Sequence, residues 1–324
     1  MRDLETLFAA EARRLPELEV GIGDDAAVLK CSGKKTLLWT SDACVEGVHF
    51  RRAWMSLEDV GWRSFQAAAS DVAAMGGRAL AALSNLILPA EFGQAELREL
   101  ARGQALAARR SRAAIIGGNL ARGSELSVTT SVLGECVKPV LRSGARAGHE
   151  LWLFGEVGLA RAGLELLRRG SPARSKPLRR CLQAFRRPLA LLDESALLAK
   201  SASAALDVSD GLAGDAARMA DASGVRLIIE EAALRSALAP ELELAASAVG
   251  VAALELALYG GEDYALLAAG RAALRPKPAR RIGRVERGHG TFLEHAGTRA
   301  CTPLGDGFDH LSVVSGKLRA SRRP

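Results

Sequence analysis

Five short acidic clusters, scattered over most of the chain, constrain its fold more than any other feature. Most of them stand where an apolar run meets Gly or Ser, as expected of a strand or helix that ends at a cleft. The clusters are Gly23-Asp24-Asp25, Ser41-Asp42, Ser70-Asp71, Asp207-Val208-Ser209-Asp210-Gly211 and Gly260-Gly261-Glu262-Asp263-Tyr264. If they converge, two like charges ~4 Å apart repel by roughly 4 kcal/mol at an effective dielectric of about 20. Divalent cations remove that cost. Mg²⁺ prefers oxygen ligands, and in enzymes it is usually bound by carboxylates and substrate phosphates together. The clusters therefore predict an enzyme that uses Mg²⁺ and a nucleotide.

The composition is that of a globular protein with room for two domains. The chain has 324 residues, of which 48% are hydrophobic and 25% charged. No apolar run approaches the ~20 residues of a membrane span, and the N-terminal stretch is mixed in charge and amphipathic, unlike a signal peptide. The five cysteines are isolated, with no CxxC and no His at ligand spacing, which argues against a zinc site or a disulfide framework. We therefore expect a cytoplasmic protein without a membrane partner.

The net charge of +7 leaves a second class of function open, that of a nucleic-acid-binding module. The basic residues, however, are distributed over several expected helices and do not form one tract. No helix-turn-helix, zinc finger or aromatic RNA-binding signature accompanies them. Bare acidic clusters would also repel phosphate, so we expect no nucleic-acid partner. A steep fall of DNA affinity with salt would identify the alternative.

The chain is organised as strands that alternate with helices in two halves. In the first half, short apolar runs predict strands at 36–40, 80–88, 113–116 and 126–134, and helices are expected at 60–75 and 94–110. In the second half, strands are expected at 150–154, up to Asp207, and at 225–230, 264–269 and 282–285, with helices at 159–169, 189–201 and 212–223. Lys138-Pro139 is typical of a crossover between domains. We expect two α/β (α+β) domains, 1–139 and 140–324, with the site in the cleft between them.

The individual clusters carry different weight. Asp71 lies in a helical stretch among small apolar residues, where an unpaired carboxylate is very costly, and this favours a functional role. Thr40-Ser41-Asp42 is expected to end a strand, and it suits either a mixed oxygen shell for Mg²⁺ or a helix cap. Asp207 and Asp210 flank a helix start, where Ser209 or Asp210 is either a plain N-cap or part of a metal and phosphate site. Gly117-Gly118-Asn119 is expected to form a turn that lets a phosphate or a base approach the backbone.

Taken in order, the motifs of this chain resemble those of thiamine-monophosphate kinases. They are Gly21-Ile22-Gly23-Asp24-Asp25-Ala26, Ser41-Asp42, Glu46-Gly47-Val48-His49-Phe50, Ser70-Asp71-Val72-Ala73-Ala74-Met75-Gly76, Gly117-Gly118-Asn119, Arg142-Ser143-Gly144-Ala145, Asp207-Val208-Ser209-Asp210-Gly211-Leu212 and Gly260-Gly261-Glu262-Asp263-Tyr264. The resemblance runs from about residue 20 to Gly307-Phe308-Asp309-His310. Each motif is weak alone, whereas the ordered set is highly specific.

The resemblance implies the two-domain fold of aminoimidazole ribonucleotide synthetase and a homodimer joined through the N-terminal sheets. It implies ATP-dependent phosphorylation of thiamine monophosphate to thiamine diphosphate by direct in-line transfer, without a catalytic side chain. Mg²⁺ ligands would be Asp25, Thr40, Ser41, Asp42, Asp71, Asn119, Asp207 and Asp210. ATP would contact Gly118, Asn119, Arg142 and Ser209. Thiamine monophosphate would contact His49, Glu262 and Phe308.

The chain departs from the family pattern at two places. Asn119 stands where Asp is common, and Ser111 and Arg112 stand where many relatives carry an aromatic residue. Within the same superfamily, aminoimidazole ribonucleotide synthetase, selenophosphate synthetase and a hydrogenase-maturation protein are alternatives. The last two use a catalytic Cys or selenocysteine near the N-terminus or a C-terminal Cys. Cys31 follows the Asp-Asp motif and Cys301 is not terminal, so neither pattern is met.

Overall fold

A six-stranded sheet is the base of the N-terminal domain in the computed structural model, which describes residues 15–31, 33–171 and 173–305. Along the sheet the strands are β1 (Leu18–Val20), β2 (Ala27–Lys30), β3 (Thr36–Val45), β6 (Ser127–Cys136), β4 (Arg78–Leu88) and β5 (Ala114–Arg122). Neighbouring strands are antiparallel except β4 and β5, which are parallel. Because β2 pairs only with the first residues of β3, the second half of β3 is open on that side.

Two helices, α2 (Leu57–Ala74) and α3 (Gln94–Arg110), cover the inner face of this sheet. The capping box of Ser56 and Asp59 starts α2, and Gly76, with a φ of 72°, follows its end. The two helices touch backbone to backbone. A Cβ on Gly61 would lie 2.1 Å from the Leu100 carbonyl oxygen, and one on Gly103 would lie 1.9 Å from that of Glu58. These glycines therefore allow α2 and α3 to pack in direct backbone contact.

The outer face of the same sheet carries large apolar side chains that no described element covers. Trp39, Leu83 and Ile87 are 52%, 39% and 44% exposed. They lie on β3 and β4, where successive side chains alternate between the two faces. Apolar surface of this kind marks a contact with another molecule more often than a solvated face.

A seven-stranded sheet forms the C-terminal domain within the described part of the chain. Its order is β13 (Cys301–Pro303), β12 (Gly290–Glu294), β9 (Arg226–Glu230), β11 (Arg280–Glu286), β7 (Glu150–Phe154), β10 (Ala265–Gly270) and β8 (Ala204–Val208). The helices are α4 (Leu159–Arg168), α5 (Lys176–Arg186), α6 (Ser195–Ser201), α7 (Leu212–Ser223), α8 (Glu231–Ala237), α9 (Pro240–Val249) and α10 (Ala253–Tyr259), with the 3₁₀ turn η1 (Ala272–Leu274). The strands β8 and β10 are buried along their whole length.

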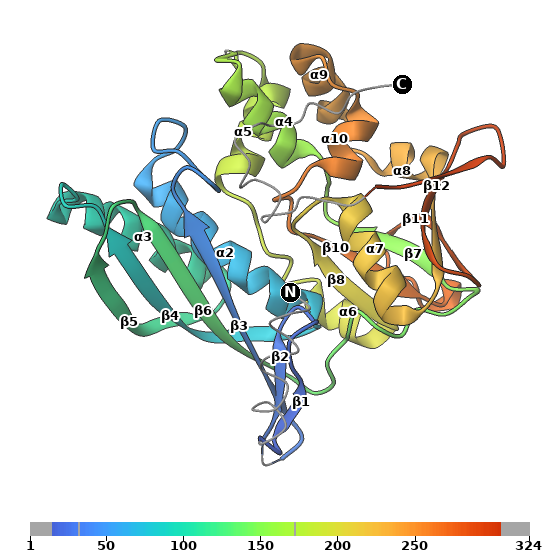
Figure 1. Ribbon diagram of the computed structural model, residues 1–324, viewed down its shortest axis with the longest axis horizontal. Coiled ribbons are helices and arrows are strands. Elements are labelled where there is room, and N and C mark those ends of the chain that lie inside the picture. The colour runs from blue at the N-terminus through green and yellow to red at the C-terminus, as the bar shows by residue number, and fades with distance from the viewer. Residues whose placement is uncertain (1–14, 32, 172, 306–324) are drawn as a thin grey trace.

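Helix α2 lies between the two sheets and joins the domains (Figure 1). The segment after α5, which we call the return arm (residues 187–192), crosses back over this helix. Trp62 Nε1 donates to the Pro188 carbonyl oxygen at 2.7 Å, and the Ala190 amide donates to Gln66 Oε1 at 2.8 Å. The domains are thus tied by specific hydrogen bonds in addition to the chain crossover.

The expected two-domain α/β fold is confirmed, and the differences lie in element ends. The strand expected at 36–40 continues to Val45, and that at 113–116 continues to Arg122. The helix expected at 189–201 is confined to Ser195–Ser201, because the preceding residues form the return arm. The short strands β1, β12 and β13 were not predicted.

In the described residues no single helix is long and apolar enough to cross a membrane. Only α9 and α10 together reach the required length and composition, and these two helices are bent by 102° at the break between them.

Candidate active site

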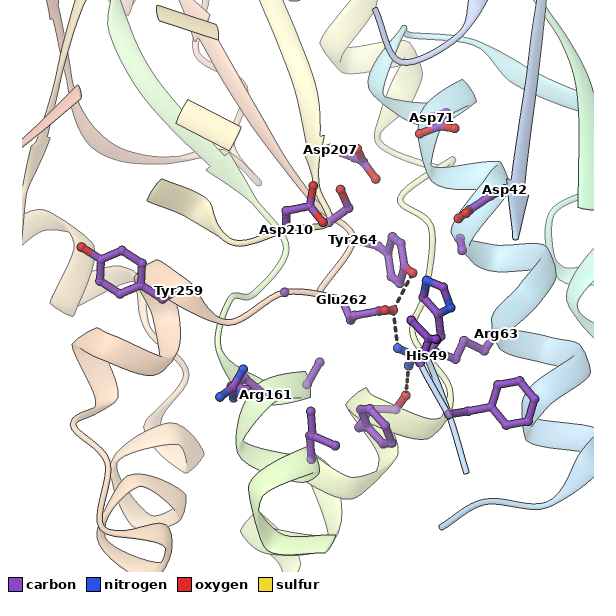
Figure 2. A pocket seen from close by; sticks show the side chains of 18 of the residues that line it. Asp42, His49, Arg63, Asp71, Arg161, Asp207, Asp210, Tyr259, Glu262 and Tyr264 are labelled. Carbon is purple, nitrogen blue, oxygen red and sulfur yellow. Dashed lines mark hydrogen bonds and ion pairs between the residues drawn. The ribbon is translucent and has the colours of Figure 1, made fainter. Parts of the chain in front are cut away.

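A cavity of about 650 Å³ opens between the two domains, and most of the predicted site residues line it (Figure 2). Those residues are Asp25, Thr40, Ser41, Asp42, His49, Asp71, Arg142, Asp207, Ser209, Asp210 and Glu262. Gly118 and Asn119 do not line it, and Phe308 lies outside the described residues. The clusters that are far apart in the sequence therefore converge, as predicted.

Three carboxylates form the centre of this site. Asp25 precedes β2, Asp71 lies in the last turns of α2, and Asp207 lies near the end of β8. One oxygen from each lies within 4.8 Å of the others. Burial raises the pKa of Asp25 and of Asp71 well above the usual value and that of Asp207 to about 6. Three carboxylates at this spacing resist ionisation unless a cation joins them.

The partners of the three carboxylates leave part of their charge uncompensated. Thr40 Oγ1 donates to Asp71 Oδ2 at 2.5 Å, and Arg142 donates to Asp25 Oδ1 from Nε at 3.0 Å and from Nη2 at 2.5 Å. The second oxygen of Asp25 is buried and accepts no hydrogen bond from any described residue. A buried oxygen of this kind, beside two more carboxylates, fits a hard divalent cation.

The two faces of β3 separate Thr40 and Asp42 from Ser41. Asp42 lines the cavity on the inner face, and burial, helped by the nearby Glu262 charge, raises its pKa to about 7. The Ser41 hydroxyl lies 2.9 Å from that of Ser131 on β6, on the outer face. Thr40-Ser41-Asp42 was expected at the end of a strand, but β3 continues to Val45. Because successive side chains of a strand point to opposite faces of the sheet, the side chains of Thr40 and Asp42 point to the inner face, toward the cavity, and that of Ser41 points to the outer face.

Asp210 and Asp215 share Arg218. Arg218 Nη2 lies 2.5 Å from Asp210 Oδ2, and Nη1 contacts Asp215. Of the two alternatives left open for Ser209 and Asp210, the plain N-cap is wrong, because Gly211 is the N-cap of α7 and its φ of 108° suits only glycine. Burial raises the pKa of Asp215 to about 7. The ion pair of Asp215 and Arg218 was not predicted from the sequence, although two opposite charges three residues apart in a helix could have indicated it.

Glu262 is held by Arg63 and Tyr264, which sequence reasoning did not single out. Arg63 extends from α2, is 1% exposed, and donates to Glu262 and to the Phe185 carbonyl oxygen (Figure 2). Its guanidinium also lies 4.7 Å from the centre of the Phe185 ring. The Tyr264 hydroxyl donates to Glu262 Oε2 at 2.7 Å. A fully buried Arg joined to both domains fixes the Glu262 side chain at the cavity wall.

Asp263, the neighbour of Glu262, points elsewhere and caps a helix. It accepts hydrogen bonds from the amides of Gly158 at 2.6 Å and Ala160 at 3.0 Å, at the start of α4. Burial raises its pKa to about 7. Asp24 is likewise structural, because it accepts from the amide of Arg142 at 3.2 Å. In each acidic pair, then, one carboxylate lines the cavity and the other holds backbone.

His49 lies in the loop after β3. The Val45 amide donates to its Nδ1 at 3.1 Å, so Nε2 carries the proton in the neutral ring. The ring lines the same cavity as Glu262 and Asp42. A neutral His in this tautomer can donate one hydrogen bond to a ligand.

Gly118 and Asn119 lie in β5, the edge strand of the sheet, and the turn expected there is wrong. Gly118 pairs with Ser84 and Asn119 with Asn85 on β4. A Cβ on Gly118 would lie 1.8 Å from the Ser84 carbonyl oxygen, so the glycine allows the strands to approach. Asn119 is exposed on the outer face, beside Asn85. Within one chain it does not join the acidic centre.

Family models match both halves of the chain. The model of the AIR synthase related protein N-terminal domain matches residues 23–136, and that of the C-terminal domain matches residues 146–296. Two such domains with an acidic cavity between them define a protein of the AIR synthase related class.

Similar proteins of known function and similar solved structures show which family within this class the chain belongs to. Thiamine-monophosphate kinase of Aquifex aeolicus (strain VF5) is 35% identical over 280 residues, which are 84% of this chain and 89% of that protein. The enzyme of the same name from Mycobacterium tuberculosis (strain CDC 1551 / Oshkosh) is 38% identical over 82% of this chain and 79% of its own. A solved structure described as AaThiL complexed with AMPPCP and TMP covers 96% of this chain and 98% of its own, with a TM-score of 0.84 and 32% identity. The chain belongs to the thiamine-monophosphate kinase family.

Proposed function

We propose that this protein transfers the γ-phosphoryl group of ATP directly to thiamine monophosphate, giving thiamine diphosphate, with the help of several Mg²⁺ ions. The observation that carries the proposal is the convergence of the Asp25, Asp71 and Asp207 carboxylates, together with the buried Asp25 Oδ2, which has no hydrogen-bond partner among the described residues. Membership of the thiamine-monophosphate kinase family and the relative's complex with AMPPCP, an ATP analogue, and TMP support the choice of substrates.

The residues that would hold Mg²⁺ are the oxygen donors of the cavity. They are Asp25, Thr40, Asp42, Asp71, Asp207 and Asp210. Ser41, whose hydroxyl lies on the outer face of β3, stays a prediction for this role. When bound, the ions shield the negative charge of the phosphates and stabilise the charge that develops during transfer. Arg142 and Ser209 would contact the nucleotide. His49 and Glu262 would contact the thiamine phosphate, and Phe308 stays a prediction for the same role.

The protein's own groups supply positioning rather than proton transfer. A phosphate monoester has a second pKa of about 6, so the acceptor oxygen is already ionised at neutral pH and needs no general base. Arg63 and Tyr264 fix Glu262, and Arg142 orients Asp25. Fixed groups of this kind lower the barrier by holding the reactants in line.

We also propose that the protein is a cytoplasmic homodimer. The uncovered apolar side chains of Trp39, Leu83 and Ile87 support a contact between two N-terminal sheets. Asn119 and Gly118 lie on this sheet, so they would act on a nucleotide across the dimer and not within one chain. All five cysteines are unpaired, which suits a reducing compartment.

One assay tests the activity. The purified protein is incubated with ATP, Mg²⁺ and thiamine monophosphate, and thiamine diphosphate is measured by chromatography. Product should form only when all three are present. If thiamine monophosphate gives no turnover while formylglycinamidine ribonucleotide does, the activity is that of the purine-synthesis relative instead.

A further inference from the structure

A second cavity, of about 360 Å³, lies beside the crossover between the domains, and we call it the crossover cavity. The polar side chains that line it are Lys138, Arg146, His149, Ser203 and Arg271. Val140 and Gly144 of the crossover line it too, whereas Arg142, between them in the sequence, lines the acidic cavity. One short segment therefore forms part of both cavities.

The crossover cavity is cationic, and its three cations, Lys138, Arg146 and Arg271, are exposed residues. Among the residues that the structure describes, no Asp or Glu lines it. Within the described residues, the side chains of Lys138, Arg146 and Arg271 form neither an ion pair nor a hydrogen bond. Two arginines of the acidic cavity behave differently, since Arg142 pairs with Asp25 and Arg63 with Glu262. Three unpaired cations around one hollow repel one another, and an anion would remove that repulsion.

His149 adds a buried hydrogen-bond donor to this cavity. The residue is 9% exposed, and its Nδ1 accepts from the Arg146 amide at 3.3 Å, which leaves the proton on Nε2 in the neutral ring. Burial, Arg146 and Arg271 lower its pKa, and no carboxylate opposes them. Its backbone is fixed by the Val285 amide, which donates to the His149 carbonyl oxygen at 2.8 Å.

We propose that the crossover cavity binds a small multivalent oxyanion of the diphosphate class. Two or more negative charges match three cations, and charge-assisted hydrogen bonds to Arg and Lys are the strong ones for phosphate oxygens. Lys138 stands at the end of the N-terminal domain, and His149 and Arg271 belong to the C-terminal domain. The anion therefore bridges the two domains at a place separate from the acidic centre.

Calorimetric titration of the full-length chain with sodium diphosphate tests this proposal. The buffer contains EDTA, so that the acidic cavity, without a divalent ion, repels the titrant. We expect one diphosphate per chain. The variant Arg146→Ala/Arg271→Ala should lose at least about tenfold in affinity, the effect of removing charged hydrogen bonds, and Lys138→Ala should weaken binding independently. A thermal unfolding scan confirms that each variant is folded.

Two matched controls separate a built site from general attraction. Arg98→Ala/Arg109→Ala removes the same charge from exposed positions on α3 and should leave the affinity unchanged. Arg168→Ala, at the wall of the acidic cavity, should also leave it unchanged. No binding by the wild type, an equal loss in the α3 control, or a loss confined to Arg168→Ala would each overturn the proposal. Titration with inorganic phosphate tests whether the cavity prefers a diphosphate to a single phosphate, and we expect the single phosphate to bind more weakly.

Discussion

The two walls of the acidic cavity neutralise their carboxylates in different ways. On the N-terminal wall, Asp42 and Asp71 have no cationic partner within 4.0 Å among the described residues, and only a hydroxyl and an amide donate to them. On the C-terminal wall, Asp210 pairs with Arg218 and Glu262 with Arg63. Each wall has one exception. Asp25 on the N-terminal wall pairs with Arg142, and Asp207 on the C-terminal wall, which completes the central cluster, has no Arg or Lys partner among the described residues. Most of the N-terminal wall therefore depends on an added cation, whereas most of the C-terminal wall is complete by itself.

The largest effect should come from the N-terminal wall. Asp71→Asn keeps the acceptor for Thr40 but removes the charge that would hold Mg²⁺. We expect kcat to fall on the order of 10²–10³-fold at saturating substrates, the range seen when one charge-stabilising group is lost. Steady-state kinetics on the folded variant measure this. Asp193→Asn, at an exposed position, is the matched control, and a near-wild-type kcat in Asp71→Asn would remove Asp71 from the metal site.

The stability of the metal-free protein should fall as the pH rises from about 4 to about 7. The folded state keeps protons on Asp42 and Asp207, whose pKa values are raised to about 7 and about 6, while the unfolded chain loses them near 3.8. The folded state therefore binds more protons in this window, and deprotonation costs it stability. We expect a loss of roughly 2–3 kcal/mol, less than the full shifts imply because Asp42 is only half-buried.

Urea unfolding at several pH values, with and without Mg²⁺, measures this dependence. Saturating Mg²⁺ should flatten the profile, and Asp42→Asn should reduce its slope in the metal-free protein. If stability falls equally steeply with pH in Asp42→Asn and in the wild type, the carboxylates of the N-terminal wall do not cause the pH dependence.

Behind the C-terminal wall, where Asp263 faces away from the cavity, Asp263→Ala should mainly change stability. The substitution removes two hydrogen bonds to the start of α4, whose own N-cap, Gly158, has no side chain to replace them. We expect a loss of about 1–2 kcal/mol in the free energy of unfolding, as for other helix caps. Denaturation by urea measures it. A loss of kcat as large as that of Asp71→Asn, without a loss of stability, would contradict the division between the two walls.

The smallest effect is expected at Asn119. An Asp there offers a cation a charged oxygen in place of a neutral one, so Asn119→Asp should lower severalfold the Mg²⁺ concentration that gives half the maximal rate. Titration of Mg²⁺ at fixed ATP measures it. An unchanged midpoint in a folded variant would remove Asn119 from the metal residues and leave it a role in strand pairing alone.

The order of elements could be predicted from sequence because it follows from local pattern. The convergence of the clusters was inferred from their positions at the ends of elements in two domains. Apolar runs bounded by Gly, Pro and Ser predicted most strands, and the helix expected at 60–75 corresponds to α2, which begins three residues earlier, at Leu57. The thiamine-monophosphate kinase family and its two-domain fold, suggested by the ordered motifs, are confirmed.

Register and long-range pairing could not be predicted in the same way. Whether Ser41 or Asp42 faces the cavity depends on where β3 ends, and hydrophobicity alone did not show that it continues to Val45. Arg63 looks like any helix arginine until the fold brings Glu262, 199 residues away, against it. Asp263 and Glu262 are adjacent carboxylates that the sequence alone cannot distinguish. Only the position of α4 shows that Asp263 caps a helix while Glu262 lines the cavity.

The return arm over α2 bears on how substrates come and go. A wide opening of the domains would have to break the bonds of Trp62 and Gln66 to the arm and the contact of Arg63 with Glu262 at once. Reactants should therefore enter and leave through the mouth of the cavity while the two domains keep their relative orientation. Exchange of substrate and product would then need small side-chain rotations at that mouth and no hinge motion of the domains.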